Sequence, residues 1–160
     1  MLKQLKRERG IGLLELMLSL SIIAILLVMA TRYFMVANES QKLNNAVSEV
    51  NGIAGGAANY DLSYPGYAGM TMTKLIDGRF VPGSLGGSDT NGTGANPWGG
   101  NLEVPTPTAG QGFVVKVTGV PFLGDDANTT TCKKLANMIS SSVKGSAVCD
   151  GAGTVTVTFY

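Results

Sequence analysis

The stretch "RGIGLLELMLSLSIIAILLVMA", Arg9–Ala30, decides how this chain is organised. From Ile11 to Ala30 it carries one charged residue, Glu15. At about 1.5 Å of rise per residue, a helix of this length crosses the hydrocarbon core of a bilayer. No small-x-small cleavage pattern follows the run, and the aromatic and basic residues Arg32–Phe34 suit a membrane interface. The sequence therefore predicts a retained membrane helix rather than a removed signal peptide.

Positive charge is concentrated just before this run. The first ten residues carry four basic side chains against one acidic one, whereas the rest of the 160-residue chain has 8 basic and 10 acidic residues. This asymmetry favours the N-terminal end on the cytoplasmic side of the membrane. The slightly acidic remainder does not indicate a nucleic-acid-binding surface.

Glu15 is the unusual residue of the apolar run. A carboxylate near the bilayer interior costs about 2.5 to 3.5 kcal/mol on insertion scales. One interpretation is that Glu15 lies shallow enough to reach the headgroups. The other is that the chain is cut between Gly10 and Ile11, which would create a free α-amine four residues before Glu15. Such an amine at membrane depth needs a carboxylate as much as Glu15 needs a cation.

Residues that could carry chemistry are few. The chain has no histidine, which removes the commonest general base and metal ligand. Cys132 and Cys149 are the two cysteines, and beside an export-like N-terminus a disulfide is the favoured interpretation, with two buried thiols as the alternative. Asp125 and Asp126 suggest a solvated helix start rather than a paired acid site. We therefore expect no catalytic residue, metal site or cofactor, although a membrane-tethered enzyme is the alternative from another class.

Beyond the membrane run an amphipathic helix is predicted to continue. Val36, Leu43 and Val50 belong to a set of apolar residues at three- and four-residue steps, and polar residues, among them Glu49, lie between them. The glycines near residue 55 weaken this helix, and Pro65 ends it. We expect one spine helix over residues 11–58.

The remainder reads as short alternating elements of an antiparallel sheet, which the spine helix would cover. The fold class expected is therefore α+β, a long N-terminal helix with a membrane-embedded first half packed on a C-terminal antiparallel sheet. The expected elements are a helix over 70–76, strands over 101–104 and 112–120, a helix over 125–142 and a terminal strand over 152–160.

The segment "RG-IGLLELMLSLSIIAILL" resembles the N-terminal signal of type IV prepilins. The resemblance implies that a prepilin peptidase cuts after Gly10, that Ile11 becomes the N-methylated terminus, and that Glu15 pairs with the Ile11 amine of a neighbouring subunit. It also implies that residues 1–10 are the leader and that residues 11–58 form the spine helix, with 11–32 in the membrane. Residues 59–160 would form a globular head. The α+β fold expected above, a long N-terminal helix packed on an antiparallel sheet, is similar to the fold of pilins.

The C-terminal half is similar to type IVb pilins, such as the thin-pilus pilins of conjugative plasmids. The similar features are "LIDGRFVP", the turn Asn96–Gly100, and the cysteines, so that Cys132 and Cys149 would form the disulfide of the C-terminal region. The resemblance implies a structural subunit of a helical surface filament used for adhesion, aggregation, motility or DNA transfer. Its implied partners are copies of itself, the prepilin peptidase, an assembly platform with an extension ATPase, and the inner membrane before assembly. The alternative is a type II secretion pseudopilin.

Overall fold

The computed structural model describes residues 12–108, 111–121 and 131–160. Gly10, Ile11, Asp125 and Asp126 lie outside the described residues, so the expectations for them stay predictions. The chain divides into two compact units, Met1–Glu39 and Ser40–Tyr160. The second unit holds the sheet and is called the head below.

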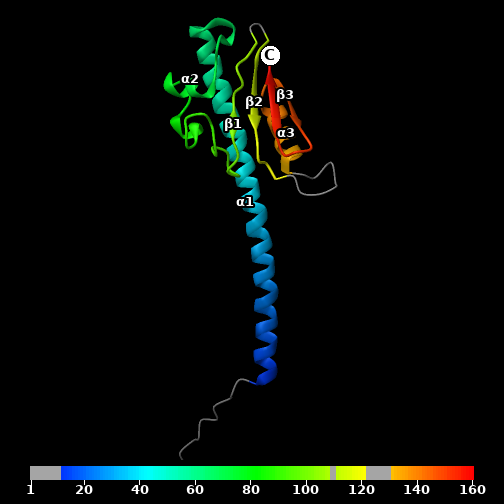
Figure 1. Ribbon diagram of the computed structural model, residues 1–160. Helices are drawn as coiled ribbons and strands as arrows, with labels where there is room; N and C mark the ends of the chain where they lie inside the picture. The colour runs from blue at the N-terminus through cyan, green and yellow to red at the C-terminus, as the bar shows by residue number, and fades with distance from the viewer. Residues whose placement is uncertain (1–11, 109–110, 122–130) are drawn as a thin grey trace, which may run out of the picture. The chain divides into compact units, whose positions relative to one another are not determined.

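Helix α1 comprises Leu13–Ser63, a single 51-residue helix shown in blue to green in Figure 1. Its first half is rich in leucine, isoleucine and methionine, which favour or tolerate a helix, and it contains no proline. The helix ends five residues later than the predicted limit of residue 58, just before Pro65, which prevents its continuation. One of its glycines, Gly56, is needed for packing. A Cβ on Gly56 would clash with Val81 Cγ1 and would lie 2.8 Å from the Phe80 carbonyl oxygen.

The buried face of α1 differs from the predicted one at two places. Val36 was expected on the apolar stripe but is 66% exposed, because burial in α1 begins only at Leu43. Glu49 was expected among the solvated polar residues but is only partly exposed. The buried residues of α1 are Leu43, Ala46, Val50, Ile53, Gly56, Ala57 and Tyr60.

Short helical elements follow α1. They are η1 (Pro65–Tyr67), α2 (Met72–Asp77) and η2 (Gly83–Gly86). The side chain of Thr71 caps α2 by accepting a hydrogen bond from the Lys74 amide. Helix α2 begins two residues after the predicted start, because that cap lies at residue 71.

The head contains a four-stranded antiparallel sheet with the order β1-β2-β4-β3. The strands are β1 (Leu102–Glu103), β2 (Phe113–Val117), β3 (Gly145–Cys149) and β4 (Val155–Phe159). Strands β2 and β4 pair along their whole length and bury alternate residues, as their alternating sequences predict. The α+β architecture expected from the sequence is confirmed.

Strand β3 was not predicted. It forms a hairpin with β4, with Cys149 opposite Val155. The Asp150 carboxylate accepts hydrogen bonds from the Ala152 and Thr154 amides, and the second of these is the main reason why the pKa of Asp150 is lowered. The carboxylate therefore fixes the turn between the two strands.

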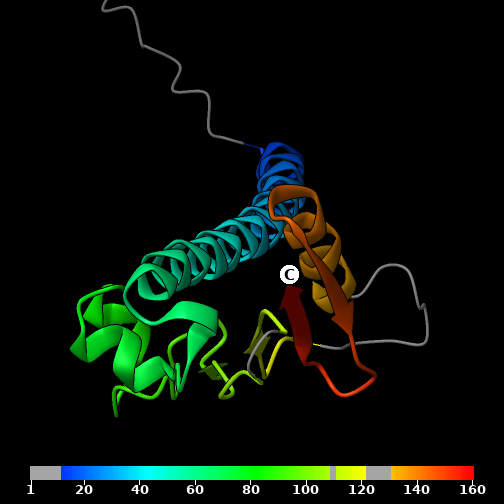
Figure 2. The same ribbon diagram turned by 90° about the horizontal axis from the view of Figure 1, so that it is seen from above.

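Helix α3 (Thr131–Ser142) lies against β3 and β4 (Figures 1 and 2). It presents Cys132, Leu135 and Ile139, all fully buried, to the core. The same hydrophobic core holds alternate residues of β2 and β4 and the buried residues of α1 from Leu43 onward. The predicted start of this helix, residues 125–130, lies outside the described residues.

The outer edge of β3 is partly closed by its own chain. The Ala147 amide donates a hydrogen bond of 3.2 Å to the Ser140 hydroxyl of α3, and the Gly145 amide donates to the Val143 carbonyl. An edge strand normally leaves such groups free to pair with another strand. These two amides of β3 are therefore occupied.

Candidate functional site

The first part of α1 is an exposed apolar surface. Every residue from Gly12 to Gln41 is exposed, including large side chains such as Leu14, at 83%, and Phe34, at 69%. Among the described residues, α1 is the one helix long and apolar enough to cross a membrane. An apolar surface of this extent needs lipid or another protein surface to cover it.

Two charged residues interrupt the apolar part of this surface, Gly12–Val36. They are Glu15, in the first turn of α1, and Arg32. Neither makes an ion pair with another described residue. The hydroxyls of Ser19 and Ser21 donate to the carbonyls of Leu16 and Met17 within the same helix, so they need no outside partner.

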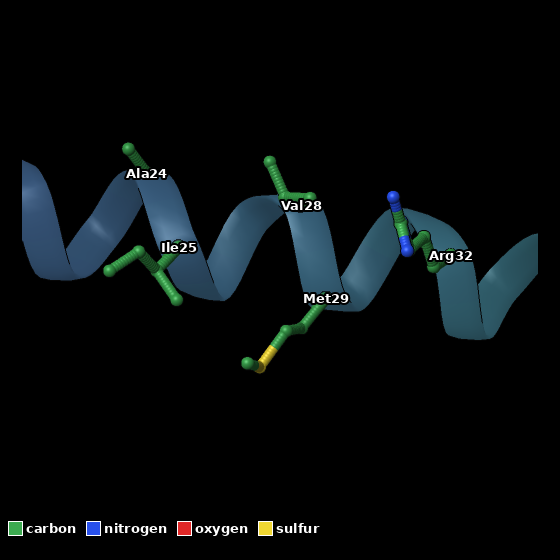
Figure 3. A pocket seen from close by; sticks show the side chains of 5 residues that line it. All are labelled: Ala24, Ile25, Val28, Met29 and Arg32. Carbon is green, nitrogen blue, oxygen red and sulfur yellow. The ribbon is translucent and has the colours of Figure 1, made fainter.

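A shallow apolar pocket lies on this surface of α1 (Figure 3). Ala24 and Val28 point to one side of it and Ile25 and Met29 to the other, while Arg32 stands at its end. The short side chain of Ala24 leaves room beside Val28. A partner side chain entering there would meet apolar walls and then a guanidinium group.

The cleavage site, Gly10 and Ile11, lies outside the described residues, so its expected processing stays a prediction. Glu15 is placed near the start of α1, where the positive end of the helix dipole favours a carboxylate. This interaction with the helix dipole contributes up to about 1 kcal/mol. It does not offset the free-energy cost of removing the charge from water.

In the head, Asn96 joins two segments through its side chain. Its Oδ1 accepts hydrogen bonds of 3.0 Å from the Trp98 and Gly100 amides, and its Nδ2 donates a hydrogen bond of 2.6 Å to the Thr118 carbonyl. Asn96 is only 4% exposed. The amide thus needs both its acceptor and its donor, which an aspartate could not supply at neutral pH.

Replacing Asn96 with alanine is expected to lower the free energy of unfolding by about 2 to 4 kcal/mol, since buried groups lose their partners. Urea unfolding of the detergent-purified chain measures this. The matched control is Asn91→Ala, at an exposed position of the same loop, for which we expect a change within about 0.5 kcal/mol. Equal effects of the two substitutions would contradict the role given to Asn96.

Glu49 was expected among the solvated polar residues of α1 but is partly buried. Its Oε2 atom is buried and accepts no hydrogen bond from any described residue. Burial raises the pKa of Glu49 from 4.5 to about 7. A carboxylate held in this way destabilises the single chain when it ionises.

Glu49→Gln is expected to remove a pH dependence of stability. Because the pKa in the folded chain, about 7, lies above the unfolded value of 4.5, the folded state holds the proton longer. The contribution of Glu49 to the free energy of unfolding is fully present below pH 4.5, and it is lost as the pH rises to about 7. Half-exposure screens the effect, so we expect Glu49→Gln to gain about 1 kcal/mol over the native chain at pH 8 and little at pH 4.

Urea unfolding at both pH values tests this expectation. Asp77→Asn, which removes an exposed carboxylate, controls for the change in net charge. A gain for Glu49→Gln that is the same at pH 4 and pH 8 would contradict burial of the ionised group as the cause.

Cys132 on α3 and Cys149 at the end of β3 are joined by a disulfide, with their Cα atoms 5.8 Å apart. Cys132 is fully buried and packs in the core. The bond ties α3 to the edge strand that α3 also covers. The described residues hold no group of three or more His, Cys, Asp or Glu side chains arranged to bind a metal ion.

Sequence reasoning missed two features of these sites. The role of Asn96 depends on Thr118, 22 residues away, and only the pairing of distant segments shows it. The helical pattern gave no sign that Glu49 is partly buried. It places Val50 on the buried stripe and therefore leaves Glu49, the residue before it, among the polar positions. The sequence predicted Arg32 at a membrane interface. Only the exposure of residues along α1 shows that Arg32 and Glu15 are the two charged residues on the exposed apolar surface between Gly12 and Val36.

Comparison with known proteins gives two family matches. The model described as PilS N terminal matches residues 38–159. The model described as prokaryotic N-terminal methylation motif matches residues 5–31, which include Gly10, Ile11 and Glu15.

Two curated relatives are each named major structural subunit of bundle-forming pilus, one from Escherichia coli O127:H6 and one from Escherichia coli O111:H-. Each is 29% identical over 99 residues, which cover 62% of this chain and 51% of the relative. The chain therefore spans about half the length of the curated relatives it matches. No solved structure matches the chain significantly.

Proposed function

Because the chain belongs to the PilS N-terminal family and carries the methylation motif, and is thus a type IV pilin, we propose that it is a structural subunit of a type IV pilus. The observation that supports this best is Glu15, a carboxylate in an exposed apolar helix inside the matched methylation motif. Such a charge is useful when other chains cover the helix and bring a cation to it.

The proposed sequence of events begins in the inner membrane. The apolar half of α1 holds the chain there with its C-terminus outside, the prepilin peptidase cuts between Gly10 and Ile11, and Ile11 is N-methylated. The free amine then pairs with Glu15 of a neighbouring subunit. An assembly platform and extension ATPase move the subunit into a filament at the cell surface. Residues 1–10 thus serve as leader, 11–58 as spine with 11–32 in the membrane, and 59–160 as head.

In this proposal the chain has no catalytic role and no cofactor, and its work is assembly. Subunits that pack head to tail without closing a ring form a filament. The exposed apolar surface of α1 becomes the filament core, and the heads face the solvent. The filament would serve adhesion, aggregation, motility or DNA transfer. The pseudopilin alternative is not favoured, since both curated relatives are named as pilus subunits.

Intact mass of the chain purified from its native host tests the proposal. We expect a mass that lacks Met1–Gly10, gains one methyl group, and loses two hydrogens for the Cys132–Cys149 disulfide. Electron microscopy of the cell surface then separates a long pilus from a short periplasmic pseudopilus. A full-length, unmethylated chain in cells with an active prepilin peptidase would contradict the proposal.

A further inference from the structure

We propose that neighbouring copies of this chain pack α1 in parallel with a stagger equal to the spacing from Glu15 to Arg32, so that Glu15 of one copy pairs with Arg32 of the next. This inference rests on the proposed function, because it needs a filament. It adds to that function the register of the helices and the identity of a second cation for Glu15.

The first argument is charge complementarity on one surface. Between Gly12 and Val36 the exposed part of α1 carries one acid and one base, Glu15 and Arg32. They cannot pair within one chain, since the helix between them spans about 25 Å. When other copies cover this surface, each charge loses water and needs an opposite charge. The proposed stagger supplies both partners at once.

The second argument is that the same spacing recurs. Glu49 follows Arg32 in the sequence of α1 at the same interval at which Arg32 follows Glu15. Glu49 has a buried carboxylate oxygen that no group of the described part of the chain hydrogen-bonds. The offset in sequence that aligns Glu15 with Arg32 therefore also aligns Arg32 with Glu49.

The third argument is the angle between the charges around the helix. From Glu15 to Arg32 the helix makes about 4.7 turns, so the two residues lie about 100° apart around α1. Each charge can thus lie within about 50° of a common line of contact, which a long side chain can span. Leu18 and Met35 each follow a charge by three residues, so the stagger that aligns Glu15 with Arg32 also brings Leu18 of one copy to the level of Met35 of the next.

The pairing is compatible with the Ile11 amine. A carboxylate has two oxygens and several acceptor positions, so Glu15 can accept from Arg32 of one neighbour and from the amine of another. The apolar pocket next to Arg32 gives the approaching helix room beside Ala24 (Figure 3).

Cysteine cross-linking of assembled filaments tests the stagger. In the variant Leu18→Cys with Met35→Cys, both positions are exposed, at 64% and 70%. Within one chain they are about 25 Å apart, far beyond the roughly 4.4 to 6.8 Å between Cα atoms that a disulfide allows. Mild oxidation of filaments should therefore join different copies and give a ladder of covalent multimers on a non-reducing gel.

The matched control is Leu18→Cys with Val28→Cys. Val28 lies two helical turns before Met35, on nearly the same face of the helix, but a bond from Leu18 to Val28 needs a shorter stagger. We expect no ladder from this pair. Filaments that give a ladder with the control pair, or no ladder with Leu18→Cys and Met35→Cys, would overturn the stagger and leave the proposed function standing. Absence of filaments from the unsubstituted chain would overturn both.

Charge variants provide a test that does not depend on assembly of the cysteine variants. We expect Arg32→Gln to reduce surface filaments at least tenfold while the chain stays in the membrane, and Arg32→Lys to retain most of them. Normal filament numbers with Arg32→Gln would overturn the register.

Discussion

Glu15→Gln is expected to abolish surface filaments while the chain remains in the membrane at its normal level. The substitution keeps the size and polarity of the side chain and removes the charge. A neutral amide cannot attract a cation from a neighbouring subunit as a carboxylate does. Breaking a buried ion pair by removing one partner costs about 3 to 5 kcal/mol. About 1.4 kcal/mol corresponds to a tenfold change in an equilibrium constant, so we expect the amount of surface filament to fall by well over tenfold.

The measurement compares the sheared surface fraction with the membrane fraction by immunoblot, with electron microscopy of the cells. Ser19→Ala is the matched control, because the Ser19 hydroxyl donates to the Leu16 carbonyl of its own helix. We expect it to leave filament number unchanged. Normal filaments with Glu15→Gln would show that the charge of Glu15 is not used in assembly.

Removal of the disulfide is the second large effect expected. Cys132→Ala with Cys149→Ala opens a cross-link between residues 17 apart in sequence, and the free energy of unfolding should fall by about 2 to 4 kcal/mol. Alanine avoids burying a hydroxyl group at position 132, which is fully buried. The loss should be concentrated in α3 and β3, which the bond joins.

Urea unfolding of the detergent-purified chain, with and without reductant, measures this effect. Reductant should destabilise the native chain by about as much as the double substitution does, and it should leave the double variant unchanged. A double variant as stable as the oxidised native chain would show that packing of α3 on the sheet suffices without the bond.

The parts of the structure that the sequence predicted are those with a local pattern. The apolar run from Ile11 predicted the first half of α1, and alternation of β-branched residues predicted β2 and β4. These patterns arise from burial of one face of an element, which sequence periodicity records directly.

The parts that were missed depend on contacts between distant segments. Strand β3 has the sequence Gly-Ser-Ala-Val-Cys, with small residues and only one β-branched one, so its extended form comes from pairing with β4. The end of α1 was predicted five residues early because the glycines near residue 55 were expected to weaken the helix. One of them, Gly56, is instead a point of close contact with the Phe80 backbone and the Val81 side chain.

The closed edge of β3 has a consequence for storage. Pilin subunits held side by side in a membrane before assembly collide often, and an open strand edge would let two heads join irreversibly through their backbones. The Ser140 hydroxyl and the Val143 carbonyl occupy two amides of that edge. With these two amides occupied, a second head that meets β3 finds fewer backbone donors to pair with than at an open edge.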